Sequence, residues 1–257
     1  MRRIALVIVF MALVLAAGCS RPTDRLQVAG STSVQPLAEI LAEAYERSGG
    51  GRVLVQGGGS TAGIFAVQNG IAELGATSRS LTADESAGGL VEHIIGYDLL
   101  SVVVHPSNPV DHLSLKQLRL LFSGAVTDWA AVGGTPGKVH LISREDGSGS
   151  RDSFRTIVGP INRQVIVLNS GGMIRMVVRG NPQAIGYVSL SVARRGGVKQ
   201  VAVEGKQPGE PGYPLLRPIS FVTLGQPKGR AEAFLRFVRG PGGQELIRSY
   251  GLLPAEG

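Results

Sequence analysis

The sequence predicts an α/β protein with a mainly parallel sheet. Short apolar runs typical of buried strands alternate with segments whose apolar residues recur at helical spacing. Of the 257 residues, 43% are hydrophobic, which is enough for a packed core and excludes a disordered chain. We find no internal repeat and no low-complexity tract. The length allows one large domain or two smaller ones.

The first three strands are expected at 26–29, 52–56 and 72–76, each an apolar run that ends in Gly, Ser or Thr. Between the first two, Pro36 is typical of the first turn of a helix, and Leu37 and Leu41 fall on one helical face. A shorter helix follows the second strand. After the third strand, the pair Asp84-Glu85 is typical of a helix start rather than of an acid/base pair.

The rest of the chain continues the alternation. Further strands are expected at 99–104, 139–143, 164–168, 184–188 and 216–223. Helices are expected after Ser114, which forms a capping box with Gln117, and then around 154–157, at 173–178 and twice between 234 and 247. Trp129 is interpreted as a packing anchor rather than as a stacking platform.

The first 18 residues have the features of a secretory signal that is removed from the mature protein. Arg2 and Arg3 precede an apolar run from Ile4 to Ala17, which is shorter than the ~20 residues that span a bilayer. Small residues stand directly before Cys19, the only cysteine. This order resembles a bacterial lipoprotein processing site, at which the cysteine becomes the lipidated first residue. An ordinary cleaved signal with an incidental cysteine, or an uncleaved anchor, is the alternative interpretation.

Charge and cysteine content exclude several classes of function. The net charge is +7, but the basic residues are scattered, which does not favour nucleic-acid binding and leaves a mild positive field that favours small anions. One cysteine allows no internal disulfide and no cysteine-based zinc cluster, and the four histidines show no ligand spacing. We therefore expect no metal and no cofactor.

Three expected strands end in clusters of Gly, Ser and Thr that begin a helix, at 30–33, 57–61 and 147–150. A helix N-terminus carries free N–H groups and the positive end of the helix dipole, and small residues let an anion approach the backbone. Each cluster alone is compatible with an ordinary N-cap. Three of them at the carboxyl ends of strands indicate a shared crevice, to which Arg144 adds a guanidinium that can hold two oxyanion oxygens.

Catalytic motifs are absent or weak. The chain contains no Gly-x-Ser-x-Gly elbow and no P-loop, and Gly57-x-Gly59-x-x-Ala62 is only a loose dinucleotide fingerprint. An enzyme with Ser60 or Ser148 as its nucleophile would need a His–Asp pairing that the spacing does not suggest. We therefore predict that the protein is not an enzyme.

Several motifs together resemble the phosphate-binding receptors of bacterial ABC transporters. They are Gly30-Ser31-Thr32-Ser33-Val34-Gln35-Pro36-Leu37, Gly59-Ser60-Thr61-Ala62-Gly63, Ser78-Arg79-x-Leu81 and Ser143-Arg144-Glu145-Asp146-Gly147-Ser148-Gly149-Ser150-Arg151. The match continues at 121–124 with Trp129, at 184–188 and at 213–215, and closes at 234–238 and 243–244. The motifs follow the order of the family and cover nearly all of the mature chain.

The resemblance implies a two-lobed α/β periplasmic-binding-protein fold of type II, with the ligand in a cleft between the lobes. After a signal peptide at 1–18, one lobe would comprise residues 26–100 and 216–257, and the other residues 101–215. The chain would cross between the lobes near 99–104 and 215–221.

The resemblance also implies a phosphate site. Its contact residues would be Ser31, Thr32, Ser33, Ser60, Ser78, Arg144, Ser148, Gly149 and Ser150. Asp146 matches the acidic residue that pairs with the arginine, and Arg79 and Arg151 would support the site. The best-studied branch of the family has a carboxylate at the position of Ser78, where it accepts the proton of the bound phosphate. Glu73 or Asp146 is the candidate for that role here, so selectivity for phosphate over sulfate stays open.

The expected function is that of a lipid-anchored solute-binding protein on the extracytoplasmic face, in the periplasm or at the cell surface. It would act as a monomer that captures inorganic phosphate, passes it to the permease subunits of an ABC importer and binds no nucleic acid. The alternatives are a receptor for another tetrahedral oxyanion, a phosphate sensor and an exported hydrolase.

Overall fold

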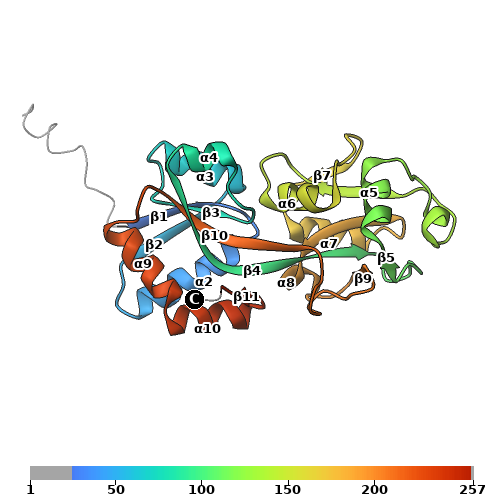
Figure 1. Ribbon diagram of the computed structural model, residues 1–257. Coiled ribbons are helices and arrows are strands. Elements are labelled where there is room, and N and C mark those ends of the chain that lie inside the picture. Colours follow the sequence, from blue (N-terminus) through green and yellow to red (C-terminus); the bar gives the residue numbers. More distant parts are fainter. Residues whose placement is uncertain (1–24, 256–257) are drawn as a thin grey trace, which may run out of the picture.

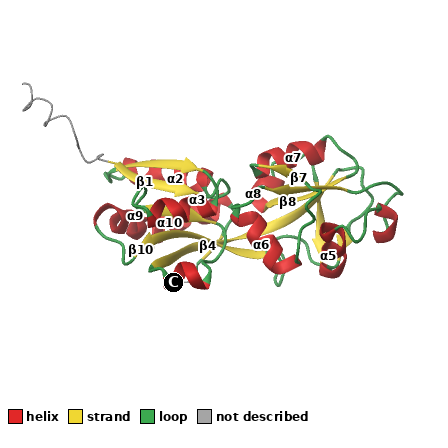
Figure 2. Ribbon diagram, turned by 90° about the horizontal axis from the view of Figure 1, so that it is seen from above, coloured by secondary structure: helices red, strands yellow, loops and turns green. Residues whose placement is uncertain are grey.

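The computed structural model describes residues 25–255, which form an α/β protein in two groups of elements joined by two long strands (Figure 1). Residues 1–18, which are expected to form a signal sequence, and Cys19 lie outside the described residues. The view from above shows the same two groups (Figure 2). Within residues 25–255, no helix combines the length and the apolarity needed to cross a membrane.

One group, called here the first lobe, contains both the beginning and the end of the described chain. Its elements are β1 (Arg25–Gly30), α2 (Gln35–Arg47), β2 (Arg52–Gly57), α3 (Ser60–Gln68), β3 (Leu74–Thr77), α4 (Ala83–Ala87), α9 (Gly229–Arg239), α10 (Pro241–Tyr250) and β11 (Leu253–Pro254). Strands β2, β1 and β3 pair in parallel in that order.

The second lobe is built from the middle of the chain. Its elements are β5 (His112–Leu113), α5 (Leu115–Ser123), the 3-10 turn η1 (Trp129–Val132), β6 (His140–Arg144), α6 (Gly149–Val158), β7 (Ile166–Leu168), α7 (Gly171–Arg179), β8 (Ala184–Ser189), α8 (Leu190–Ala193) and β9 (Lys199–Val203). Strands β8, β6 and β7 pair in parallel.

Strands β4 (Leu90–Val104) and β10 (Leu216–Leu224) connect the lobes (Figure 1). They pair with each other antiparallel, β10 also pairs antiparallel with β3, and residues 100–104 of β4 pair antiparallel with β8. The expectation of a mainly parallel sheet is therefore wrong at the centre. The physical reason is that β4 carries the chain out to the second lobe and β10 brings it back, so the two strands run in opposite directions.

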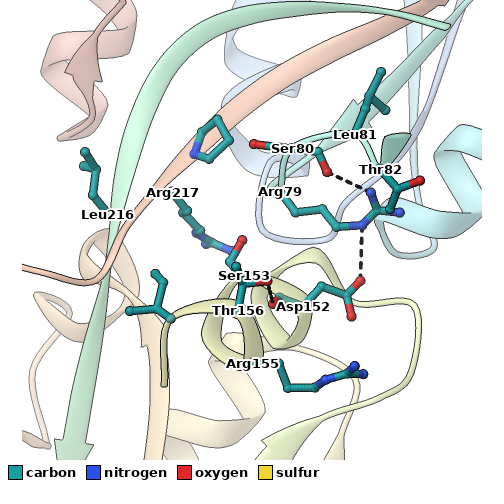
Figure 3. A pocket seen from close by; sticks show the side chains of 12 residues that line it. Arg79, Ser80, Leu81, Thr82, Asp152, Ser153, Arg155, Thr156, Leu216 and Arg217 are labelled. Carbon is teal, nitrogen blue, oxygen red and sulfur yellow. Dashed lines mark hydrogen bonds and ion pairs between the residues drawn. The ribbon is translucent and has the colours of Figure 1, made fainter. Parts of the chain in front are cut away.

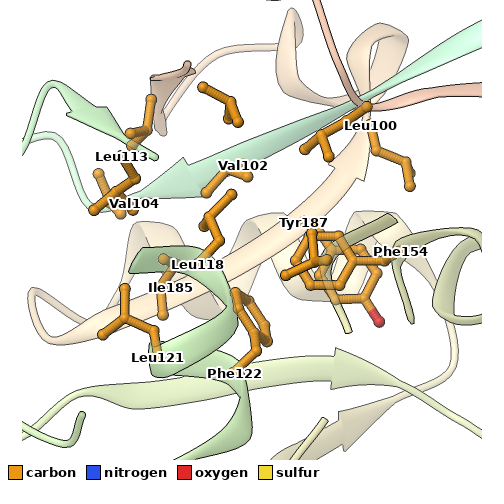
Figure 4. Close-up of a cluster of buried hydrophobic side chains, with 14 of the residues drawn as sticks. Leu100, Val102, Val104, Leu113, Leu118, Leu121, Phe122, Phe154, Ile185 and Tyr187 are labelled. Atoms are coloured by element: carbon orange, nitrogen blue, oxygen red, sulfur yellow. The ribbon is translucent and has the colours of Figure 1, made fainter. Parts of the chain in front are cut away.

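Each lobe has its own hydrophobic core. In the second lobe, the rings of Phe154 and Tyr187 stack with centroids 4.0 Å apart, and Phe122 packs edge-on against Phe154 (Figure 4). Trp129 is buried in this core and its Nε1 donates to the carbonyl of Gln183, which confirms its interpretation as a packing anchor. In the first lobe, Phe221 and Phe234 pack between the sheet and the C-terminal helices.

The predicted helix starts are present. Pro36 lies in the first turn of α2, and Ser114 forms the capping box with Gln117 that begins α5. Glu85 belongs to a second capping box, in which Thr82 is the N-cap of α4, so the acidic pair there marks a helix start as expected. In each case the signal is local: the capping side chains bond to the backbone within one turn, and Pro36 fixes its own backbone angle.

Candidate functional site

Three strand–helix junctions of the first lobe bring hydroxyl groups together. Because β2, β1 and β3 are parallel neighbours, their carboxyl ends share one edge of the sheet. There, the Oγ atoms of Ser31 and Ser78 lie 2.9 Å apart, and the backbone N–H of Ser78 donates to Ser60 Oγ at 3.1 Å. All three serines are buried.

The second lobe adds the N-terminus of α6 and one arginine. Ser148 is the N-cap of this helix and accepts a hydrogen bond from the backbone N–H of Arg151. Gly149 faces the first lobe so closely that an added Cβ would collide with Ser60 Oγ and lie 2.6 Å from Ser78 Oγ. Only glycine fits this position without a shift of the surrounding side chains.

The two lobes are in direct contact at this place. The Oγ atoms of Ser33 and Ser150 lie 2.9 Å apart, and Ser153 Oγ donates to the carbonyl of Ser78 at 3.0 Å. Arg144 Nη2 donates to Thr32 Oγ1 at 2.8 Å. The structure thus brings the nine predicted contact residues into one cluster, in which helix N-termini of both lobes face each other.

Arg144 is buried at the end of β6, with only 2% of its surface exposed. Its Nε and Nη2 donate to the two carboxylate oxygens of Glu145 at 2.8 and 2.7 Å, and Nη2 also reaches the carbonyl of Asn169. The expected pairing with Asp146 is wrong, because the Asp146 side chain is 93% exposed and pairs with Arg151 Nε at 3.3 Å. Arg151 in turn donates to the carbonyl of Arg144, so it supports the site through the backbone.

Among residues 25–255, neither Glu73 nor Asp146 lies where it could take the proton-accepting role expected of them. Asp146 is exposed, and Glu73, directly before the start of β3, accepts from the backbone N–H of Gln27 and from Arg230. Neither side chain reaches the hydroxyl cluster. A hydroxyl both donates and accepts hydrogen bonds, so the cluster itself can serve a protonated anion.

Arg79 bridges the lobes beside this cluster. It forms two hydrogen bonds to the carboxylate of Glu85. It also forms an ion pair with Asp152 of α6 at 3.2 Å, which Figure 3 shows. The hydrogen bonds from Arg79 lower the pKa of Glu85, and the same contact raises the pKa of Arg79. A cavity of about 630 Å³ adjoins the bridge, lined by 79–82, 152–153, 155–157 and 216–218.

Sequence reasoning missed one buried ion pair at the junction of the lobes. Arg217 on β10 and Asp98 on β4 are both fully buried, and Arg217 Nη2 lies 2.6 Å from Asp98 Oδ2. Nη1 of the same guanidinium donates to Ser150 Oγ at 2.6 Å. The sequence did offer one signal for this pair: each of the two apolar, strand-forming segments contains a charged residue. Burying a charge costs free energy unless an opposite charge pairs with it.

Neither candidate nucleophile is activated. Ser60 Oγ accepts from the backbone of Ser78, and Ser148 Oγ accepts from the backbone of Arg151. Across residues 25–255, no histidine or carboxylate bonds to either hydroxyl, so neither has a general base. The same part of the chain contains no group of three or more Asp, Glu, His or Cys side chains placed to hold a metal.

Comparison with known proteins places this geometry in a family. Residues 17–240 match the model of the PBP superfamily domain. The chain is 27% identical over 254 residues to the phosphate-binding protein PstS of Bacillus subtilis, an alignment that covers 93% of this chain and 83% of the relative.

Two solved structures are similar over their full length. A putative phosphate ABC transporter substrate-binding protein from Clostridium perfringens, with bound phosphate, superposes with a TM-score of 0.85 at 32% identity. An ABC-type phosphate transport receptor from Vibrio cholerae superposes with a TM-score of 0.78, also at 32% identity. Both alignments cover 90% of this chain and all of the other. The chain therefore belongs to the PBP superfamily and, within it, to the PstS family of phosphate-binding proteins of phosphate ABC transporters.

Proposed function

We propose that this protein is the receptor that captures inorganic phosphate outside the cytoplasm and delivers it to the permease of an ABC importer. The observation that carries the proposal is the meeting of hydroxyl groups and helix N-termini from both lobes around buried Arg144. The full-length similarity to phosphate receptors supports it. The contact residues would be Ser31, Thr32, Ser33, Ser60, Ser78, Arg144, Ser148, Gly149 and Ser150.

Capture would exchange the hydration shell of the anion for fixed protein donors. Backbone N–H groups at the starts of α2, α3 and α6 carry the positive ends of the helix dipoles, and serine and threonine hydroxyls supply further donors. Arg144 contributes the charge. Because a buried anion is costly unless fully paired, selectivity follows from how completely these donors fit its oxygens.

Calorimetry with purified mature protein tests this proposal. We expect one phosphate bound per chain, with arsenate as a competitor because it has the same shape and a similar protonation pattern. Sulfate and molybdate carry no proton near neutral pH. Their affinities relative to that for phosphate therefore show whether the hydroxyl cluster accepts the proton of bound phosphate, as the carboxylate would. Binding of sulfate or molybdate without binding of phosphate would instead support a receptor for another oxyanion.

The lobes would close on the ligand by bending at β4 and β10. We assign residues 26–100 and 216–257 to one moving unit and residues 101–215 to the other, since within residues 25–255 the chain passes between the lobes along β4 and again at the start of β10. Hinge closure of this kind makes a protein more compact. Small-angle scattering should give a smaller radius of gyration with saturating phosphate, and identical curves would contradict a hinge between these units.

Lipid anchoring is a separate proposal that concerns residues outside the described part of the chain. Removal of residues 1–18 would leave Cys19 as the lipidated first residue. One acyl chain binds membranes only reversibly, so stable anchoring requires more than one. Cys19→Ser should release the protein from the membrane fraction or leave it unprocessed, and a variant that matures and partitions like the wild type would refute the anchor.

A further inference from the structure

The buried ion pair at the lobe junction is placed where the two connecting strands face each other. Arg217 of β10 and Asp98 of β4 are partners in the antiparallel register, and their side chains are 0% and 2% exposed. Both Nε and Nη2 of Arg217 donate to Asp98 Oδ2, at 3.1 and 2.6 Å. Since each charge is neutralised by the other, the pair contributes no net charge to the site.

The rest of this network leads to the second lobe. Asp98 Oδ1 accepts from the hydroxyl of Ser189, the last residue of β8, at 2.9 Å. Arg217 Nη1 donates to Ser150 Oγ, on the second residue of α6, at 2.6 Å. A buried guanidinium needs acceptors beyond its carboxylate partner, and here the acceptor of Nη1 is a residue of the anion site.

Chemistry fixes which group donates in the hydrogen bond between Arg217 and Ser150. A guanidinium has only donors, so Ser150 Oγ must accept from Arg217 and keeps its single hydrogen for another partner. In this structure that hydroxyl lies 2.9 Å from Ser33 Oγ, across the line where the lobes meet. An oxyanion between the helix N-termini would find the Ser150 hydroxyl already turned to donate.

We propose that Arg217 is a positioning residue for phosphate: it holds the Ser150 hydroxyl as a hydrogen-bond donor to the anion. Asp98 accepts from two nitrogens of the guanidinium and, on its other oxygen, from the hydroxyl of Ser189, which fixes the guanidinium in place. This inference rests on the proposed function. Arg217 thus acts through Ser150, whereas Arg144 would contact the anion itself.

A double-mutant cycle in phosphate affinity tests the inference. The hydrogen bond in question runs from the Ser150 hydroxyl to the phosphate anion, and losing a bond to a charged group should weaken binding about tenfold. Arg217→Lys and Ser150→Ala are therefore each expected to raise the Kd for phosphate by about that factor. Lysine retains the charge opposite Asp98 but not the forked geometry. If Arg217 acts through Ser150, the double variant should bind no more than about threefold more weakly than Ser150→Ala alone.

Controls separate this role from a structural one. Arg155→Lys makes the same change at an exposed position of α6 and should leave Kd unchanged. Circular dichroism and the melting temperature without ligand establish that each variant folds. If Arg217→Lys does not fold, the variant Arg217→Gln with Asp98→Asn, in which neutral partners replace the ion pair, is combined with Ser150→Ala in its place. Independent losses that multiply to about a hundredfold would overturn the inference, while a wild type that does not bind phosphate would instead refute the proposed function.

Discussion

The two lobes supply different chemistry to the same site. The first lobe contributes hydroxyls, from Ser31, Thr32, Ser33, Ser60 and Ser78, while its nearby cation Arg79 is occupied by Glu85 and Asp152. The second lobe contributes the buried guanidinium of Arg144 and the N-terminus of α6. Arg144 is itself paired with Glu145, but its Nη2 also reaches Thr32 Oγ1 in the hydroxyl cluster. We therefore expect the second lobe to provide most of the attraction for an anion, and the first lobe to orient its oxygens.

Removing the cation of the second lobe should have the largest effect. Truncating a desolvated partner of a bound charge costs about 2–5 kcal/mol, roughly 30- to several-thousand-fold in affinity. Arg144→Ala should therefore abolish tight phosphate binding in calorimetry. Arg144→Lys should recover only part, because an ammonium group cannot reproduce the planar fork that holds Glu145 while the same guanidinium contacts the anion. Arg155→Ala, at an exposed position of the same lobe, is the control. Binding by Arg144→Ala within threefold of wild type would place the anion elsewhere.

Preventing the close approach of the lobes should come next. In Gly149→Ala the new methyl group would collide with Ser60 and Ser78 of the first lobe, and overpacking of this kind costs about 1–3 kcal/mol. Affinity should fall, and scattering should show a larger radius with phosphate than for the wild type. Gly172→Ala in α7 is the matched control, since its Cβ would meet only Ser170 Oγ, at 3.9 Å. Equal affinity of both variants would mean that the lobes do not close at Gly149.

The pH dependence of folding should lie in the first lobe, away from the site. His93 Nδ1 accepts from Arg239, so Nε2 donates to Thr223, and burial together with Arg239 lowers the pKa of His93 to about 4. The pKa of a histidine in the unfolded chain is about 6.5, so below that pH His93 is protonated in the unfolded chain but stays neutral in the folded one. The free energy of unfolding should therefore fall as the pH is lowered from about 6.5 to 4, by on the order of 2 kcal/mol.

Urea unfolding across this range, for wild type and His93→Gln, checks that assignment. The variant should lose most of this slope while it keeps wild-type phosphate affinity at pH 7.5. An unchanged slope would assign the dependence to other groups, such as Glu85, whose depressed pKa contributes stability that is lost only at more acidic pH, as the pH falls through that lowered value.

Removing one hydroxyl of the first lobe should have the smallest effect. Ser33→Ala deletes a neutral donor that faces Ser150 across the lobes, and such a bond contributes about 0.5–1.5 kcal/mol, a few-fold in affinity. Calorimetry should show this modest loss, with a change in the ratio of phosphate to sulfate affinity if the first lobe orients the oxygens. A loss as large as that of Arg144→Ala would contradict the division of roles between the lobes.

Much of the architecture is predictable from the sequence because its signals are local. Alternating apolar runs and helical spacing place most strands and helices within a few residues, and the capping residues Ser114 and Thr82 act within one turn. The first half of β4 was missed because Glu92, His93 and Asp98 interrupt its apolar pattern. The short strand β9 (Lys199–Val203) was also missed, since it is recognisable by its pairing with β4 and β5.

The sequence by itself determined which loops could address an anion, because small residues at strand ends and helix starts act through their own backbone. The tertiary structure alone decided the partners of the long charged side chains. Arg144 is held by Glu145 rather than Asp146, and Arg217 finds Asp98 at a separation of 119 residues. The reason is that a flexible charged side chain is placed by what surrounds it after folding, and no spacing along the chain encodes that neighbourhood.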